Sequence, residues 1–158
     1  MIAALDPMDI PLLRASPEHA RELAELHAVL FTPSWDEASF RRLLAHPGSH
    51  AFLARVATPP QTAGLILGQF AADEAEILTL GVCQGHRRQG IARRLVIALT
   101  HAAKRAGAKR LFLEVGRHNA AAVSLYQGQG FCQVGLRQGY YEHAGQRRDD
   151  ACVLALAL

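Results

Sequence analysis

The sequence predicts a single α/β (α+β) domain over residues 1–158, in which one mixed sheet carries helices on both faces. Two observations lead to this prediction. Residues 50–82 have the composition of three strands separated by short turns, which is typical of an antiparallel meander. The flanking segments repeat apolar residues every three or four positions, which is the spacing of amphipathic helices. The expected order of elements is β-α-α-β-β-β-α-β-α-β-β.

The first half of the chain predicts a strand, two helices and the meander. Ser16, Pro17 and Glu18 supply an N-cap, a first-turn proline and an early acidic residue, so a helix is expected to begin there. Residues 31–35 interrupt the helical spacing before a second helix. The expected elements are a strand at 10–15, helices at 16–30 and 37–45, and strands at 51–56, 63–70 and 76–82.

A long amphipathic helix leads the second half. Ile91, Leu95 and Leu99 recur on one side of residues 89–105, and Gly107 is expected to end this helix. The strands before and after it are expected to be parallel and joined by a right-handed crossover. The remaining expected elements are a strand at 109–115, a helix capped by Asn119 and running to 127, and strands at 130–136 and 150–156.

Charge and composition exclude several classes of protein. Seventeen Lys and Arg against fourteen Asp and Glu give a net charge of +3, an excess too small to predict a nucleic-acid partner. No stretch reaches the roughly 18 to 20 apolar residues of a membrane span, so we expect no membrane partner and a cytoplasmic location. The three cysteines lack Cys-x-x-Cys spacing and the histidines lack metal-ligand spacing, so neither a disulfide framework nor a metal site is expected.

Positive charge is concentrated at the junction between the last meander strand and the long helix. Gly90 and Ala92 would let an anion approach the N–H groups at the start of that helix, and a pyrophosphate fits this description. The alternatives are a solvated helix face and a small nucleic-acid patch, whereas a dinucleotide-binding fingerprint is disfavoured because its Gly-x-Gly-x-x-Gly spacing is missing. The arginines of this junction are Arg87, Arg88, Arg93 and Arg94.

Glu114 is the candidate catalytic carboxylate. Strand alternation places it on the same face as Phe112 and opposite Leu111, Leu113 and Val115. A carboxylate in such a strand is costly unless it is used or paired. Two interpretations follow: a general base for an ammonium group, or a structural partner of one of the arginines.

The junction segment Arg87-Arg88-Gln89-Gly90-Ile91-Ala92 fits the pattern Arg/Gln-x-x-Gly-x-Gly/Ala, and through it the sequence resembles the GCN5-related N-acetyltransferase (GNAT) superfamily. The resemblance implies a mostly antiparallel seven-stranded sheet and acetyl-CoA as co-substrate, without a metal. It also implies that Arg87, Arg88, Gln89, Gly90, Ile91 and Ala92 bind the CoA pyrophosphate, and that the backbone of Leu80, Gly81 and Val82 pairs with the pantetheine arm. Cys83-Gln84 replaces the proline that is common after this strand.

The residues from Glu114 to Tyr126, followed by Gly130-Phe131, resemble the second half of the same family's pattern. The resemblance implies that Glu114 helps to deprotonate the amine through water, that Asn119 binds the cofactor arm, and that Tyr126 lies by the sulfur and protonates the leaving CoA thiolate. The alternatives are a plain N-cap for Asn119 and a core ring for Tyr126.

Aromatic residues make the sequence most similar to the ribosomal-protein-alanine N-acetyltransferases, the RimI type. The similarity rests on the loop Phe31-Thr32-Pro33-Ser34-Trp35 and on the pair Tyr140-Tyr141. The resemblance implies that Phe31, Trp35, Tyr140 and Tyr141 bind the acceptor, a protein N-terminal α-amine such as that of a ribosomal protein. Ordinary aromatic packing, a small-molecule acceptor and a non-catalytic CoA-binding module are the alternatives.

Overall fold

The chain forms one continuous sheet in the computed structural model, which describes residues 10–57, 60–142 and 148–158. Over these residues the sheet has seven strands in the order β1-β2-β3-β4-β5-β7-β6, and β4 and β5 are its one parallel pair. The elements are β1 (Leu12–Arg14), η2 (Pro17–His19), α1 (Ala20–Leu30), α2 (Glu37–Ala45), β2 (Ser49–Ala57), β3 (Pro60–Ala71), β4 (Glu74–Val82), η3 (Gln84–His86), α3 (Ile91–Arg105), β5 (Arg110–Gly116), α4 (Ala120–Gly128), β6 (Cys132–Glu142) and β7 (Arg148–Ala157). The predicted fold class and element order are therefore confirmed.

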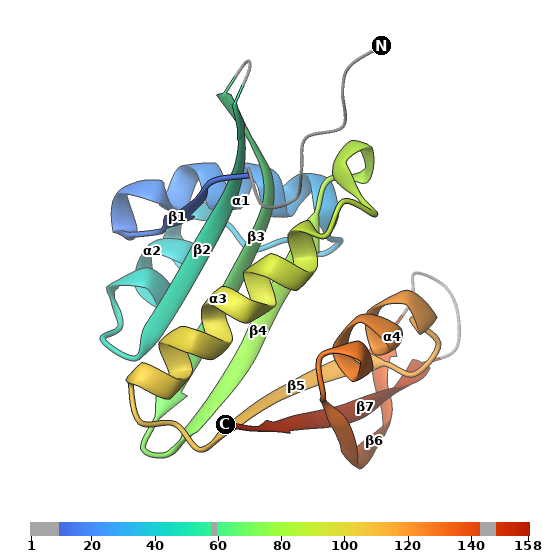
Figure 1. The fold of residues 1–158 in the computed structure, drawn as a ribbon. Helices are drawn as coiled ribbons and strands as arrows, with labels where there is room; N and C mark the ends of the chain where they lie inside the picture. Colours follow the sequence, from blue (N-terminus) through green and yellow to red (C-terminus); the bar gives the residue numbers. More distant parts are fainter. Residues whose placement is uncertain (1–9, 58–59, 143–147) are drawn as a thin grey trace.

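Helices cover both faces of the sheet, as Figure 1 shows. On one face, Leu23 of α1 and Phe40 of α2 pack with Leu65 and Leu67 of β3. On the other face, Ile66 of the same strand packs with residues of α3 and α4. Because successive side chains of a strand point to opposite faces, β3 contributes to both cores.

The strands β4 and β5 pair over only three residues. Glu74–Glu76 lie beside Arg110–Phe112, and no further pairs join the two strands among the residues that the structure describes. β4 also carries a bulge, because Ile77 lies opposite Gly68 while Thr79 lies opposite Leu67, which leaves Leu78 as an extra residue. Figure 1 shows β4 and β5 diverging toward their C-terminal ends.

Several element bounds differ from the sequence prediction. The long helix begins at residue 91, two positions later than predicted, because Gly90 takes a left-handed conformation with φ 77° and acts as its N-cap. The segment after Ser16 first forms the 3₁₀ turn η2, and the Ser16 backbone N–H donates to Nδ1 of His19 at 3.0 Å. β6 extends to residue 142, six positions beyond its predicted end.

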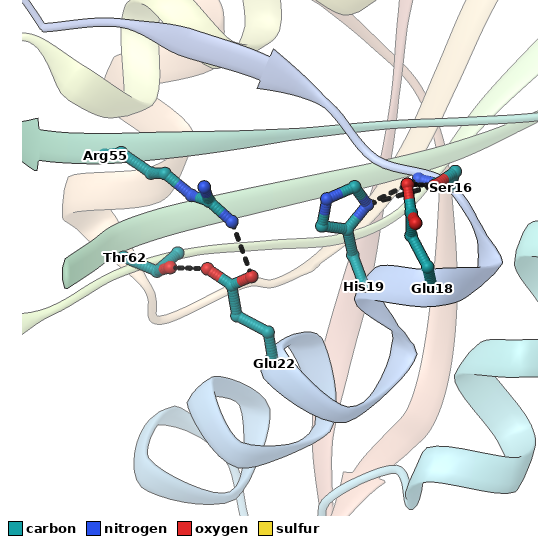
Figure 2. A network of polar contacts seen from close by, with 6 residues as sticks. All are labelled: Ser16, Glu18, His19, Glu22, Arg55 and Thr62. Atoms are coloured by element: carbon teal, nitrogen blue, oxygen red, sulfur yellow. Dashed lines mark hydrogen bonds and ion pairs between the residues drawn. The ribbon is translucent and has the colours of Figure 1, made fainter. Parts of the chain in front are cut away.

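A polar network fixes α1 across β2 and β3 (Figure 2). The carboxylate of Glu22 forms an ion pair with Arg55 of β2 at 2.7 Å and accepts a hydrogen bond from the hydroxyl of Thr62 in β3. The Thr62 carbonyl in turn accepts from the thiol of Cys83 at 3.7 Å. This network therefore connects α1 to the residue at which β4 leads into the basic turn.

Candidate functional site

A cavity of about 560 Å³ lies between the diverging ends of β4 and β5. Residues from α1, the loop after it, β4, β5 and the start of α4 line this cavity. The structure thus brings together residues that are up to 99 positions apart in the chain, from His27 to Tyr126. Six of the residues singled out from the sequence line it, namely Phe31, Trp35, Leu80, Glu114, Asn119 and Tyr126.

The basic turn follows β4 and leads into α3. Arg88 and Gly90 both have positive φ, at 62° and 77°, on either side of Gln89. Backbone of this kind turns successive N–H groups toward one point and makes an anion-binding concavity. The first N–H groups of α3, a 15-residue helix, add unpaired donors and a positive dipole end. The turn can therefore bind a phosphate group through backbone donors.

The arginines of this turn have different partners. Arg87 donates from Nε to the carbonyl of Val82 at 3.1 Å, and Arg94 donates to the carbonyl of Ile10. Arg88 and Arg93 are exposed. Of the two arginines expected to bind the pyrophosphate, Arg87 thus bonds the protein's own backbone, whereas Arg88 is exposed. Ile91 is buried, so only its backbone N–H can face an anion.

Glu114 lies in the cavity wall and in an ion pair at the same time. Arg137 of β6 contacts both of its carboxylate oxygens, at 3.0 and 3.3 Å, and the Glu114 side chain is 24% exposed. This is the arginine pairing that the sequence left open as an alternative. Glu76 of β4 is a second carboxylate nearby, and its pKa is raised above the ordinary 4.5 by burial and by the charge of Glu114.

Asn119 and Tyr126 combine structural positions with a place in the cavity wall. The Asn119 side chain accepts from the backbone N–H of Ala122 at 3.2 Å and caps α4, as the sequence predicted. Tyr126 is 6% exposed, and its ring meets that of Phe131 edge to face at 5.5 Å. Asn119 is therefore an N-cap and Tyr126 a core ring, and neither contact excludes a role toward a ligand.

The aromatic loop after α1 forms another part of the cavity wall. Phe31, Pro33 and Trp35 line it together with His27 of α1. His27 is a site residue that the sequence did not single out, because helical spacing alone does not distinguish it from the apolar residues around it. A signal existed, since a histidine on the buried side of a helix needs hydrogen-bond partners for its ring nitrogens.

Three further expectations concern the tyrosine pair of β6, a metal site and a membrane span. Tyr140 and Tyr141 belong to β6, but their side chains lie outside the part of the chain that the structure describes. Among the described residues, no group of three or more His, Cys, Asp or Glu side chains could hold a metal ion. No helix within those residues is long and apolar enough to cross a membrane.

Comparisons with known proteins agree on one family. The model of the Acetyltransferase (GNAT) family matches residues 20–131. The chain is 39% identical over 149 residues to the N-alpha-acetyltransferase RimI of Mycobacterium tuberculosis, covering 92% of this chain and 91% of that protein. It is 29% identical over 157 residues to the [ribosomal protein bS18]-alanine N-acetyltransferase of Escherichia coli, covering 99% and 97%. The crystal structure of the ribosomal-protein-S18-alanine N-acetyltransferase from Escherichia coli superimposes with a TM-score of 0.82 at 26% identity, covering 93% and 94%.

Proposed function

Because the chain belongs to the acetyltransferase (GNAT) family, we propose that this acyltransferase transfers the acetyl group of acetyl-CoA to the α-amine at a protein N-terminus, with a ribosomal protein as the expected acceptor. The observation that carries the proposal is the cavity between β4 and β5, because it joins the end of β4, Tyr126 of α4 and the aromatic loop in one space. The end of β4 would serve the cofactor, and the aromatic loop would serve the acceptor.

The cofactor half of the site uses backbone groups. Pairing between β4 and β5 stops at Glu76, so the edge of β4 from Ile77 to Val82 has no strand beside it on that side among the described residues. An extended pantetheine arm, which carries amide groups, can add to such an edge as a strand would. Leu80, Gly81 and Val82 would pair with this arm, and the turn from Arg87 to Ala92 would hold the pyrophosphate.

The chemistry proposed for the cavity is direct transfer in a ternary complex. The neutral amine attacks the thioester carbonyl, the C–S bond breaks, and the acetyl group stays on nitrogen, which releases one proton that balances the proton given to the thiolate. Glu114 would remove a proton from the ammonium through a water molecule, and Tyr126 would give a proton to the departing thiolate. Arg137 would keep the Glu114 carboxylate oriented, because its guanidinium lies 3.0 Å away.

An N-terminal α-amine suits this arrangement better than a lysine side chain does. The α-amino group has a pKa of roughly 7.7 to 8.0, against about 10.4 for lysine, so a useful fraction is neutral near pH 7. A carboxylate that acts through water is a mild base and can complete this deprotonation. The apolar wall of Phe31, Pro33 and Trp35 would accept the first residues of the acceptor chain.

The test is mass spectrometry of a peptide panel with varied N-termini, incubated with acetyl-CoA and the enzyme. We expect one acetyl group on the α-amine of some peptides and none on lysine-bearing peptides with blocked N-termini. Glu114→Gln and Tyr126→Phe should each lower kcat by about 10²- to 10⁴-fold, the usual range for a lost acid or base. Glu25→Gln, on the exposed side of α1, is the matched control and should keep full activity.

Three results would contradict the proposal. Acetylation of small amines in preference to every peptide would assign the cavity to a metabolite. Full turnover by both Glu114→Gln and Tyr126→Phe, with acetyl-CoA bound, would show that the assigned roles are wrong. Binding of acetyl-CoA without thiol release in the presence of any amine would instead indicate a CoA-sensing module.

A further inference from the structure

His27 is a buried histidine in the wall of the cavity. Its side chain is 3% exposed, and it lies near the C-terminal end of α1, directly before the aromatic loop. It contacts the loop on one side and β4 on the other. A buried polar ring of this kind is costly unless its nitrogens are bonded, so its partners indicate what it does.

The hydrogen bonds of His27 fix which nitrogen carries the proton. The backbone N–H of Trp35 donates to Nδ1 at 3.0 Å, and because a backbone N–H can only donate, Nδ1 must be unprotonated. The ring proton therefore lies on Nε2, which donates to Oγ1 of Thr79 at 3.3 Å. The neutral imidazole thus connects the loop to β4 with one accepted and one donated bond. Burial lowers the pKa of His27 below the ordinary 6.5, which favours this neutral form.

Aromatic packing adds to these bonds. The His27 ring stacks on Trp35 with centroids 4.9 Å apart and planes 18° apart, and it lies 4.4 Å from the ring of Phe31. It also meets Phe40 of α2 edge to face at 5.4 Å. One side chain therefore sets the positions of both aromatic rings that form the loop's wall of the cavity.

The bond to Thr79 relates this loop to the cofactor half of the site. Thr79 is the residue directly after the bulge in β4, and its hydroxyl points toward α1. The next residues of β4, Leu80 to Val82, form the open edge proposed for the pantetheine arm. His27 thereby holds the acceptor wall at a fixed position relative to the strand along which the acetyl group would arrive.

We propose that His27 is a positioning residue for the acceptor, which holds Phe31 and Trp35 against β4 so that the acceptor N-terminus meets the thioester. This inference rests on the proposed function, because it assigns the aromatic loop to the acceptor. It follows that loss of the Nδ1 contact should raise KM for the acceptor peptide while leaving KM for acetyl-CoA close to that of the wild type.

The experiment compares His27→Asn with His27→Gln. An asparagine amide oxygen can occupy the region of Nδ1 and accept from Trp35, whereas a glutamine amide reaches the region of Nε2 and Thr79. We expect His27→Gln to raise the acceptor KM by about tenfold, as for a lost bond that leaves a buried donor unpaired, and His27→Asn to recover most of that loss. His101→Asn, on the exposed side of α3, is the matched control and should leave both KM values unchanged.

A second readout does not depend on turnover. Trp35 is the single tryptophan of the chain, so its fluorescence emission and its quenching by acrylamide report on the loop directly. We expect red-shifted, more easily quenched emission in His27→Gln and near wild-type emission in His27→Asn. Thr79→Val, which keeps the ring and removes its partner on β4, should show a smaller change of the same kind and serves if the His27 variants do not fold.

The outcomes separate this inference from the proposed function. If the wild-type enzyme acetylates no peptide N-terminus, the proposed function fails, whatever the variants do. If the wild type is active but His27→Gln keeps the wild-type acceptor KM and Trp35 emission, the role of His27 is refuted. Equal losses in His27→Asn and His27→Gln, with unchanged Trp35 emission, would also overturn it, because they would show a packing defect without movement of the loop.

Discussion

Gly81 of β4 lies close to the end of α1 and to Phe31 of the aromatic loop, and replacing it tests the geometry of the site. A Cβ atom added there would lie 2.7 Å from Cδ1 of Leu30 and 3.1 and 3.2 Å from two ring atoms of Phe31. The leucine methyl can rotate away. The Phe31 ring cannot do so as freely, because the centroid of the His27 ring lies 4.4 Å from that of Phe31. Gly81→Ala should therefore push Phe31 out of the cavity wall by a few tenths of an ångström.

The expected cost follows from this crowding. Adding a methyl group to a packed region usually costs about 1 to 3 kcal/mol, and the free rotation of Leu30 places Gly81→Ala near the lower end, at about 1 kcal/mol of unfolding free energy. Displacement of the Phe31 ring should also lower kcat/KM for the acceptor peptide by about fivefold, which corresponds to a similar free energy. Binding through the turn from Arg87 to Ala92 should change less, because the added methyl group points toward α1.

Urea denaturation and steady-state kinetics with an N-terminal peptide measure the two effects. Gly85→Ala is the matched control, because a Cβ atom there would meet nothing within 4 Å. Its stability should stay within about 0.5 kcal/mol of the wild type. If Gly81→Ala matches Gly85→Ala in both assays, then Phe31 is not held against β4, and the reasoning about the acceptor wall is refuted.

Three further predictions concern stability. Because burial lowers the pKa of His27 below 6.5, its contribution to folding stability is present above pH 6.5 and is lost as the pH falls through the folded-state pKa. Urea denaturation from pH 8 to 5 should therefore show a smaller loss of stability toward acid in His27→Asn than in the wild type. The pKa of Glu76 is raised in the folded protein, so its contribution to folding stability is fully present below pH 4.5 and is lost as the pH rises through the folded-state pKa. Glu76→Gln should therefore raise the melting temperature at pH 8 and leave it nearly unchanged at pH 4. Asn119→Ala should cost about 1 kcal/mol through loss of the α4 cap, while Asn119→Asp, which can also accept from Ala122, should recover most of it in the same thermal unfolding assay.

The fold could be predicted where local patterns decide the structure. The bounds of α2 match the predicted 37–45 because Asp36 caps the helix through the N–H of Ser39, a pattern that is visible in the sequence. The side-chain alternation of β5 is likewise confirmed, with Leu111, Leu113 and Val115 buried. The start of α3 lies two residues later than the sequence predicts, because helical spacing does not show that Gly90 takes a left-handed conformation.

Partners that depend on tertiary structure could not be predicted. Arg137 lies 23 positions after Glu114, and only the pairing of β5 and β6 with β7 brings the two charges together. The bond of Arg87 to the Val82 carbonyl depends on how the turn folds back on the strand. The sequence therefore supplies the candidate residues of the site, and the sheet topology determines which of them bond one another.

The bulge at Leu78 explains how one strand can serve both halves of the site. The extra residue shifts the alternation of β4, so that Leu78 packs in the core beneath α1 and the following Thr79 bonds His27 of the same helix. Leu80 and Val82 then pack on the α3 side, next to the basic turn. Without the bulge, Thr79 would share the face of Ile77, beneath α3, and His27 would lose its partner on β4. One irregularity in a single strand thus holds the aromatic loop in place at the point where the strand's open edge begins, and the proposed meeting of amine and thioester depends on this arrangement.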